Sequence, residues 1–217
     1  MSADKTRSSF QSRQKKVGEA LRRDTRNRLL QAAEVEFATH GYCGTTVARL
    51  AAAAGVSVQT LYLAWGSKRE LLRGYMESLL AGPADSPEAA AGRFEGMPPR
   101  ERLAALADLV AEVADRAAIG WSLYRDAAAV DAEIADDWNE LQHLRHGLFL
   151  RVIGDVPAAS LAAGLTHKTA ADTAWAIASP DSYDLLVHRR GYSLDDFREW
   201  MKRTLNAAIL NPRLVAP

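Results

Sequence analysis

Residues 55–68, GVSVQTLYLAWGSK, contain two side chains whose chemistry matches the edges of nucleic-acid bases. The amide of Gln59 offers adenine a paired donor and acceptor, and Thr60 offers thymine a hydroxyl together with a methyl group. Both residues follow closely after Ser57, a residue type that favours the capping position at the start of a helix. We therefore expect a short helix that presents these side chains to the major groove of DNA.

The residues around this stretch predict two short helices joined by a tight turn. Before Gly55, and again after Ser57, apolar residues recur at the spacing of one helix face. The first stripe consists of Val47, Leu50, Ala51 and Ala54, and the second of Val58, Leu61, Tyr62 and Trp65. Because glycine tolerates the left-handed backbone that ends the first helix, the pattern is typical of a helix-turn-helix.

Other polar residues nearby suit contacts to the DNA backbone. Thr45 or Thr46 is placed to cap the helix that starts near residue 47, whose unpaired amides and dipole favour an anion. A tyrosine and a lysine further on are residue types that contact phosphates. The predicted DNA-contacting residues are Thr45, Thr46, Gln59, Thr60, Tyr62 and Lys68.

A formal net charge of +0 conceals an asymmetry along the chain. Residues 1–75 contain 13 Lys and Arg and 6 Asp and Glu, whereas residues 76–217 contain 14 and 21. The first part suits a polyanion and the second would repel one. Residues 1–22 hold six Lys and Arg among Ser and Gln, which predicts a disordered basic arm that adds salt-sensitive affinity for DNA.

Composition and periodicity predict an all-α fold. Hydrophobic residues make up 48% and charged residues 25% of the chain, and no alternating strand pattern of useful length occurs. After a helix that begins at Asp24 and ends near Gly41, helical patterns continue to the C-terminus except in the Gly- and Pro-rich stretch 82–99. The single cysteine excludes an internal disulfide framework, and without a signal peptide or membrane span we expect a cytoplasmic protein.

Residues 25–75 also resemble the N-terminal DNA-binding region of TetR-family transcriptional regulators. The shared elements are Phe37 with His40-Gly41-Tyr42, Gly44-Thr45-Thr46-Val47, Ala51 to Ser57, Thr60-Leu61-Tyr62, and Ser67-Lys68 followed by Glu70-Leu71. Leu63, Ala64 and Trp65 depart from the residues common in the family. The resemblance implies a three-helix DNA-binding domain joined through a fourth helix to a larger helical domain that dimerises and usually binds a small molecule. It also implies repression from a palindromic operator, ended by ligand binding.

The predicted organisation is therefore an arm at residues 1–22, a helix-turn-helix domain at 23–66, and a helical ligand-binding and dimerisation domain at 67–217. A largely apolar or aromatic ligand would need a cavity lined by aromatic residues with a few polar groups. The candidate ligand-binding residues are Trp121, Tyr124, Arg125, Trp138, His143, His146 and Trp175. By resemblance to the family, the homodimer interface would include Tyr183, Leu186, Trp200 and Leu205.

Two other functions remain open at this point. One is a helical enzyme with an accessory nucleic-acid module, although the sequence has no phosphate-binding glycine loop and no nucleophile elbow. The other is an architectural, dimeric DNA-binding protein without a ligand. No catalytic residue, metal or cofactor is predicted, since His143 and His146 share a helix face without an evident third ligand.

Overall fold

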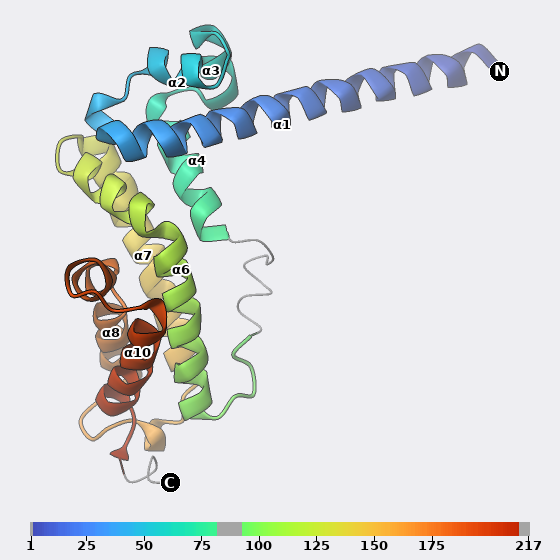
Figure 1. The fold of residues 1–217 in the computed structure, drawn as a ribbon. Helices are drawn as coiled ribbons and strands as arrows, with labels where there is room; N and C mark the ends of the chain where they lie inside the picture. The colour runs from blue at the N-terminus through green and yellow to red at the C-terminus, as the bar shows by residue number, and fades with distance from the viewer. Residues whose placement is uncertain (1, 82–92, 213–217) are drawn as a thin grey trace. The chain divides into compact units, whose positions relative to one another are not determined.

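The computed structural model describes residues 2–81 and 93–212, with the side chains of residues 17–81 and 93–212. Within these residues the fold is all-α, as the sequence predicts, apart from one isolated bridge between Leu161 and Leu210 (Figure 1). The chain divides into two compact units, Met1–Glu77 and Ser78–Pro217, which we call unit 1 and unit 2. Helix α4 continues from the first into the second.

Unit 1 is built from one long helix and three shorter ones. They are α1 (Ser2–Gly44), α2 (Val47–Ala53), α3 (Val58–Trp65) and α4 (Lys68–Ala81). Helix α1 packs against both α2 and α3, which also contact each other. It is kinked at Gly41, whose backbone has φ 65° and ψ 176°.

The predicted disordered arm is instead part of α1. The structure continues this helix back to Ser2, so Asp24 lies inside the helix and does not cap it, contrary to the sequence-based expectation. Residues 1–22 contain no proline, and their Lys, Arg, Gln and Ala residues are good helix formers. The described side chains of residues 17–24 are all exposed, so local propensity and not burial accounts for helix in this segment.

The core of unit 1 gathers apolar side chains from all four helices. Its fully buried members include Leu29, Leu50, Leu61, Leu71 and Leu72. The first predicted stripe is buried at three of its four positions, Leu50, Ala51 and Ala54, and the second at one of four, Leu61. Val58 and Tyr62, which were expected in the second stripe, are 40% and 50% exposed. Helix α3 is thus anchored by Leu61 and by the half-buried Trp65, and half of its residues are exposed.

Unit 2 is built around two long helices. Its elements are α6 (Pro99–Ala128), α7 (Ala132–Gly154), η1 (Ala158–Ser160), α8 (His167–Ile177), α9 (Pro180–Tyr183), the π-helical turn η2 (Asp184–Arg189) and α10 (Leu194–Ile209). Helices α6 and α7 lie side by side, and α8 and α10 pack against them and against each other. Helix α6 is continuous from Pro99 to Ala128, and the predicted loop 82–99 lies largely outside the described residues.

The helix starts in unit 2 follow their sequence signals. Ser193 and Asp196 form a reciprocal capping box at α10, as their spacing predicts, and Ser179 caps α9 before Pro180. Phe149, Phe197 and other apolar side chains form one continuous core in this unit.

Among the described residues no single helix is long and apolar enough to cross a membrane. Helices α2 and α3 reach that length only together, as a pair bent by 97°.

Candidate nucleic-acid interface

Helix α3 begins as the sequence predicts. The Ser57 hydroxyl accepts a hydrogen bond of 3.0 Å from the Thr60 backbone N–H and lies 2.8 Å from the Thr60 hydroxyl. In the preceding turn Gly55 has φ +63°, a conformation that strains other residues, and Val56 N–H donates to the Ala51 carbonyl at 2.9 Å. These local contacts set the direction in which α3 leaves the turn.

The outer face of α3 consists of Val58, Gln59, Tyr62 and Leu63, all of which are exposed. Gln59 and Tyr62 are thus both exposed on one face of α3, and a glutamine amide is a group that can make a paired contact to a base. Thr60 is half-buried with its hydroxyl engaged by Ser57. The face combines one amide, one phenol and two aliphatic side chains, which is a surface suited to base edges.

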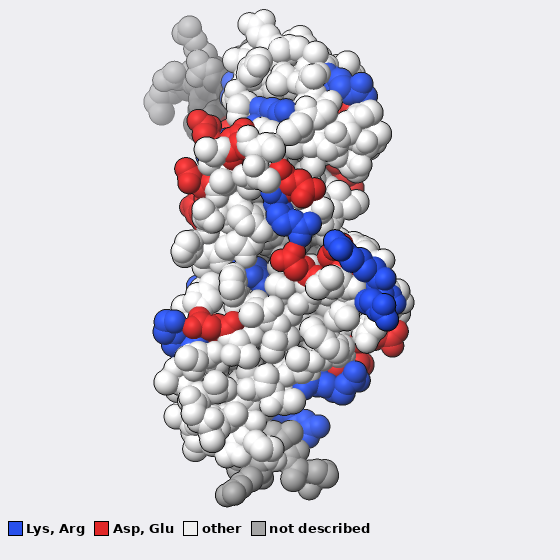
Figure 2. Space-filling view, turned by 90° about the vertical axis from the view of Figure 1, so that its left-hand side faces the viewer, with Lys and Arg blue, Asp and Glu red and all other residues white. Residues whose placement is uncertain are grey.

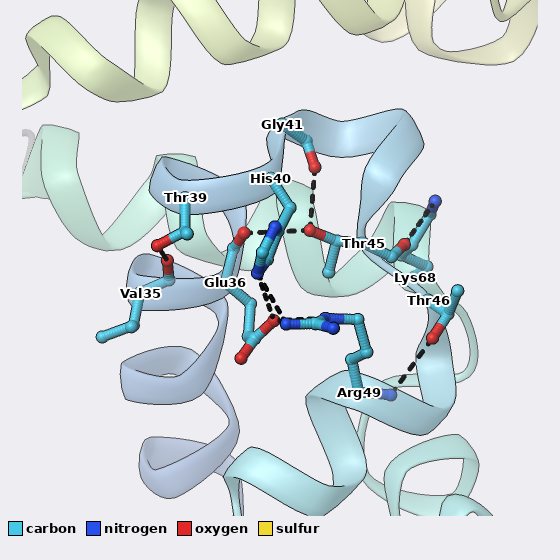
Figure 3. A network of polar contacts seen from close by, with 9 residues as sticks. All are labelled: Val35, Glu36, Thr39, His40, Gly41, Thr45, Thr46, Arg49 and Lys68. Atoms are coloured by element: carbon cyan, nitrogen blue, oxygen red, sulfur yellow. Dashed lines mark hydrogen bonds and ion pairs between the residues drawn. The ribbon is translucent and has the colours of Figure 1, made fainter.

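At α2, only one of the two predicted threonines is exposed. Thr46 caps this helix, and its hydroxyl accepts from Arg49 N–H at 3.2 Å. Thr45 is fully buried and its hydroxyl donates to the carbonyls of Glu36 at 3.0 Å and Gly41 at 2.8 Å (Figure 3). Because its side chain is enclosed by the end of α1, Thr45 holds the turn and does not face DNA, which corrects the prediction.

Lys68 is likewise used within unit 1. Its ammonium donates to the carbonyls of Tyr42 and Thr45 at 3.0 Å each and lies 3.9 Å from the centre of the Tyr42 ring. The lysine thereby joins the start of α4 to the turn between α1 and α2. This geometry gives Lys68 a positioning role within unit 1, and its phosphate contact stays a prediction.

Two arginines of α1 that the sequence did not single out hold the ends of α2 and α3. Arg28 donates to the carbonyls of Ala54 and Gly55, the latter at 3.0 Å. Arg26 donates to the Ala64 carbonyl at 2.6 Å and stacks 3.6 Å from the centre of the Trp65 ring. A cation at a helix C-terminus is favoured by the unpaired carbonyls and the helix dipole. These arginines therefore fix the orientation of both short helices relative to α1.

A third contact joins α1 to α2 through a group of three charged or polar side chains. Arg49 donates to the Glu36 carboxylate at 2.8 Å and lies 2.6 Å from His40 Nε2, which is itself 3.7 Å from the same carboxylate. Figure 3 shows Glu36, His40 and Arg49 converging from the two helices. Since Arg49 is a donor only, His40 Nε2 acts as the acceptor.

Trp65, one of the departures from the family pattern, is accommodated by a glycine of α4. A Cβ atom on Gly74 would lie only 2.1 Å from the edge of the Trp65 ring. The indole N–H of Trp65 is buried without a hydrogen-bond partner. Because glycine has only a hydrogen atom as its side chain, the Trp65 ring packs directly against α4 at Gly74. Helices α3 and α4 therefore approach closely.

In unit 2 the predicted ligand-binding residues do not form one group. Trp138 contacts the rings of Trp121 and Tyr124, with centroid distances of 5.8 Å and 6.4 Å. We call these three residues the α6–α7 aromatic cluster. The Tyr124 hydroxyl lies 3.5 Å from the buried carboxylate of Asp137. Trp121 and Tyr124 are buried in this cluster, and whether it binds a ligand stays a prediction.

Two further candidates meet between α7 and α8. The His146 ring contacts the Trp175 ring edge-on at 5.8 Å and its Nε2 lies 2.8 Å from Asp172. Arg145, which was not predicted, donates to the carbonyls of Trp175 and Ala178 at 2.7 Å and 2.8 Å. Burial lowers the pKa of this guanidinium from 12.5 to about 10. The arginine caps the end of α8, so this group fixes the packing of two helices.

The remaining two candidates point outward. His143 lies 2.7 Å from the carbonyl of Asn139 on its own helix, and Arg125 pairs with Asp181.

Within the described part of the chain no three His, Cys, Asp or Glu side chains are grouped as metal ligands. On the face shown in Figure 2, Lys and Arg side chains lie beside Asp and Glu side chains, with wide areas between them that carry neither.

The predicted interface residues separate into core and partly exposed positions. Leu205 is 0% and Tyr183 4% exposed, and the Tyr183 hydroxyl donates to Asp115 at 2.8 Å. These two residues belong to the core of unit 2, which corrects their assignment to a subunit interface. Leu186 and Trp200 are partly buried against that core and keep an exposed fraction.

The geometry of unit 1 is that of a helix-turn-helix, with α2 and α3 as the two helices and the outer face of α3 exposed. Residues 29–75 match the profile of the family described as "Bacterial regulatory proteins, tetR family". This match lies within unit 1 and identifies its helix-turn-helix region as a DNA-binding domain of the TetR family of transcriptional regulators. Regulators of this family are DNA-binding proteins and not enzymes.

Solved structures share the fold over most of the chain. NalD of Pseudomonas aeruginosa, the secondary repressor of the MexAB-OprM multidrug efflux pump, is 19% identical with a TM-score of 0.69, over 87% of this chain and 98% of NalD. A TetR transcription regulator from Haloarcula marismortui is 17% identical with a TM-score of 0.65, over 86% of this chain and 98% of that one. A search of curated proteins found no match.

Proposed function

We propose that this regulator is a repressor that binds a palindromic operator as a homodimer and releases it when a small molecule binds unit 2. The observation that carries the proposal is the outer face of α3, where Gln59 is exposed beside Tyr62 while Leu61 anchors the helix from behind. The excess of basic residues in the first 75 positions supports attraction to the DNA backbone.

The palindrome follows from symmetry. Two copies related by a two-fold axis present two α3 helices, and these fit successive major grooves when they are about 34 Å apart or a multiple of that distance. For the dimer contact we retain Leu186 and Trp200 from the predicted set, because both keep exposed surface. Each half-site would then be bound by one copy of the outer face of α3.

The first test is the selection of bound sequences from a random duplex pool by purified protein. We expect a palindromic site, and we expect Gln59→Ala to lose preference at one base pair in each half-site, worth about 1–3 kcal/mol per contact. Gln31→Ala, which removes an exposed glutamine from α1, is the matched control and should select the original site. Enrichment of no sequence above salt-sensitive background would refute specific recognition by α3.

For the ligand we propose a largely aromatic molecule that binds at the α6–α7 aromatic cluster. Helix α4, which spans the boundary between the units, would carry the response to unit 1. A ligand changes operator affinity only if it binds the DNA-bound and released forms unequally. NalD is described as the secondary repressor of a multidrug efflux pump, so aromatic antibiotics and dyes are a reasoned first panel.

The readout is operator affinity with and without each compound of the panel. Trp138→Leu should weaken both ligand binding and operator release, whereas Tyr192→Leu, which removes an exposed aromatic ring outside the cluster, should leave the ligand response intact. If no ligand changes operator affinity and the aromatic cluster binds nothing, the second candidate function, an architectural dimer without ligand, becomes the better account.

A further inference from the structure

Leu63 on α3 is highly exposed and takes no part in the buried core of unit 1. Its side chain is 81% exposed, the highest value among the large hydrophobic residues that the structure describes. Scattered surface leucines are common and need no explanation. Here, however, the leucine shares the surface of an eight-residue helix with Val58 and Tyr62, which are 40% and 50% exposed. The buried contacts of α3 are made from its opposite side through Leu61.

The position of Leu63 relative to Gln59 limits what it can meet. Residues four apart lie on one helix face and are separated by about 6 Å along the helix axis. Successive base pairs of DNA are about 3.4 Å apart. When α3 lies in the major groove, Leu63 is therefore at most about two base pairs from the base that Gln59 contacts, and it has no polar atom with which to address a phosphate.

We propose that Leu63 determines specificity by contacting the C5-methyl group of a thymine close to the base pair contacted by Gln59. Thymine is the one base whose major-groove edge carries a methyl group, and aliphatic side chains select it by apolar contact. The inference rests on the proposed function, because it requires α3 to enter the major groove. It goes beyond that function by assigning a base to a residue that the sequence analysis left outside the DNA-contacting set.

The test removes the methyl group from the DNA and the side chain from the protein separately. In the operator selected by the wild-type protein, each thymine is replaced in turn by deoxyuridine, which keeps every hydrogen-bonding group. At one symmetry-related pair of positions we expect affinity to fall about fourfold for each half-site, the effect of one buried methyl group. The doubly substituted operator should therefore bind about fifteenfold more weakly.

With Leu63→Ala the same deoxyuridine substitutions should have no effect, because the partner of the methyl group is gone. Leu144→Ala is the matched control: it removes a leucine that is 67% exposed on α7 and should retain the full deoxyuridine sensitivity. Both residues are exposed, so neither variant is expected to impair folding.

Each outcome separates this inference from the proposed function. An operator that is selected but contains no thymine within two base pairs of the Gln59 position, or shows no deoxyuridine effect there, overturns the role of Leu63 and leaves repression from a palindrome intact. Equal deoxyuridine sensitivity in the wild type and in Leu63→Ala also overturns the role of Leu63 and leaves the proposed function intact. If no operator is selected, both the proposed function and the role of Leu63 are refuted.

Discussion

Units 1 and 2 hold their helices in different ways. In unit 1 the two helices of the helix-turn-helix have seven and eight residues, and two arginines of α1 bind the carbonyls at their C-terminal ends. A lysine and a buried threonine bind carbonyls of α1 and of the turn before α2. In unit 2 the helices α6 and α7 have 30 and 23 residues and pack through a continuous apolar core. Polar contacts thus hold the ends of the short helices in unit 1, whereas buried apolar surface holds the long helices of unit 2 together.

The difference reflects helix length. Helices shorter than about 12 residues are marginal in water, so those of unit 1 depend on contacts made from outside them. Side chains that bind the terminal carbonyls also fix direction, which a leucine contact alone does not. We infer that polar contacts set the orientation of α3, while its buried apolar residues supply most of the free energy of folding. Substitutions in both units test this division.

The largest effect is expected for Leu61→Ala on α3. The leucine is fully buried, and its truncation leaves a cavity that should lower the free energy of unfolding by about 2–5 kcal/mol. Leu63→Ala, the same change two residues along the same helix, should alter stability by less than about 0.5 kcal/mol. Urea unfolding followed by circular dichroism measures both. Similar values for the two variants would show that polar contacts alone hold α3.

An intermediate effect is expected for glycine-to-alanine changes, with opposite signs in the two units. Gly74→Ala places a methyl group against the Trp65 ring and should destabilise unit 1 by about 1–3 kcal/mol. Gly147→Ala meets no atom within 4 Å on α7 and should stabilise unit 2 by about 0.4–1 kcal/mol. Thermal unfolding of both variants gives the signs.

The glycine comparison has an internal check. Trp65→Phe shortens the ring that opposes Gly74, so Gly74→Ala should be less harmful in that background than in the wild type. An unchanged penalty would mean that the close approach of α3 and α4 has another cause than the ring.

The smallest effect concerns a polar contact within the core of unit 2. Burial, and then the hydrogen bond to Asp115, raise the pKa of Tyr183 from 10.0 to about 12. The folded state therefore holds this proton more tightly than the unfolded state does. The resulting stability is complete below pH 10 and is lost as pH rises from 10 towards about 12.

Tyr183→Phe should remove this alkaline loss. The difference in free energy of unfolding between wild type and variant is expected to be constant below pH 10 and to shrink above it. The lowered pKa of Arg145 acts in the same range with the opposite sign, but it is common to both proteins and cancels in the difference. A difference that stays constant to pH 12 would contradict the assignment.

The local features of unit 1 were predictable from the sequence because they depend on neighbours in the chain. The turn at Gly55 and the cap at Ser57 are examples, since each contact spans five residues or fewer. The all-α fold and most helix bounds followed from periodicity in the same way. The helical start of α1 did not, because its charged composition is compatible with both disorder and helix.

The contacts that sequence reasoning missed join residues far apart in the chain. Arg26 meets Ala64 across 38 positions and Arg28 meets Ala54 across 26, and no local spacing indicates either pairing. The errors at Thr45, Tyr183 and Leu205 have a related origin. A threonine before a helix is compatible with either a DNA contact or a buried hydrogen bond. An apolar stripe on a helix is compatible with packing either in the core of its own chain or against a second copy.

The packing of Trp65 against Gly74 also gives the molecule a built-in reporter. Of the five tryptophans in the chain, Trp65 is in unit 1, and Trp121, Trp138, Trp175 and Trp200 are in unit 2. Labelling with 5-fluorotryptophan would therefore yield fluorine resonances that separate the two units in one sample. The Trp65 signal would register a shift of α3 when DNA is added, and the signals of Trp121 and Trp138 would test whether an added compound binds the aromatic cluster.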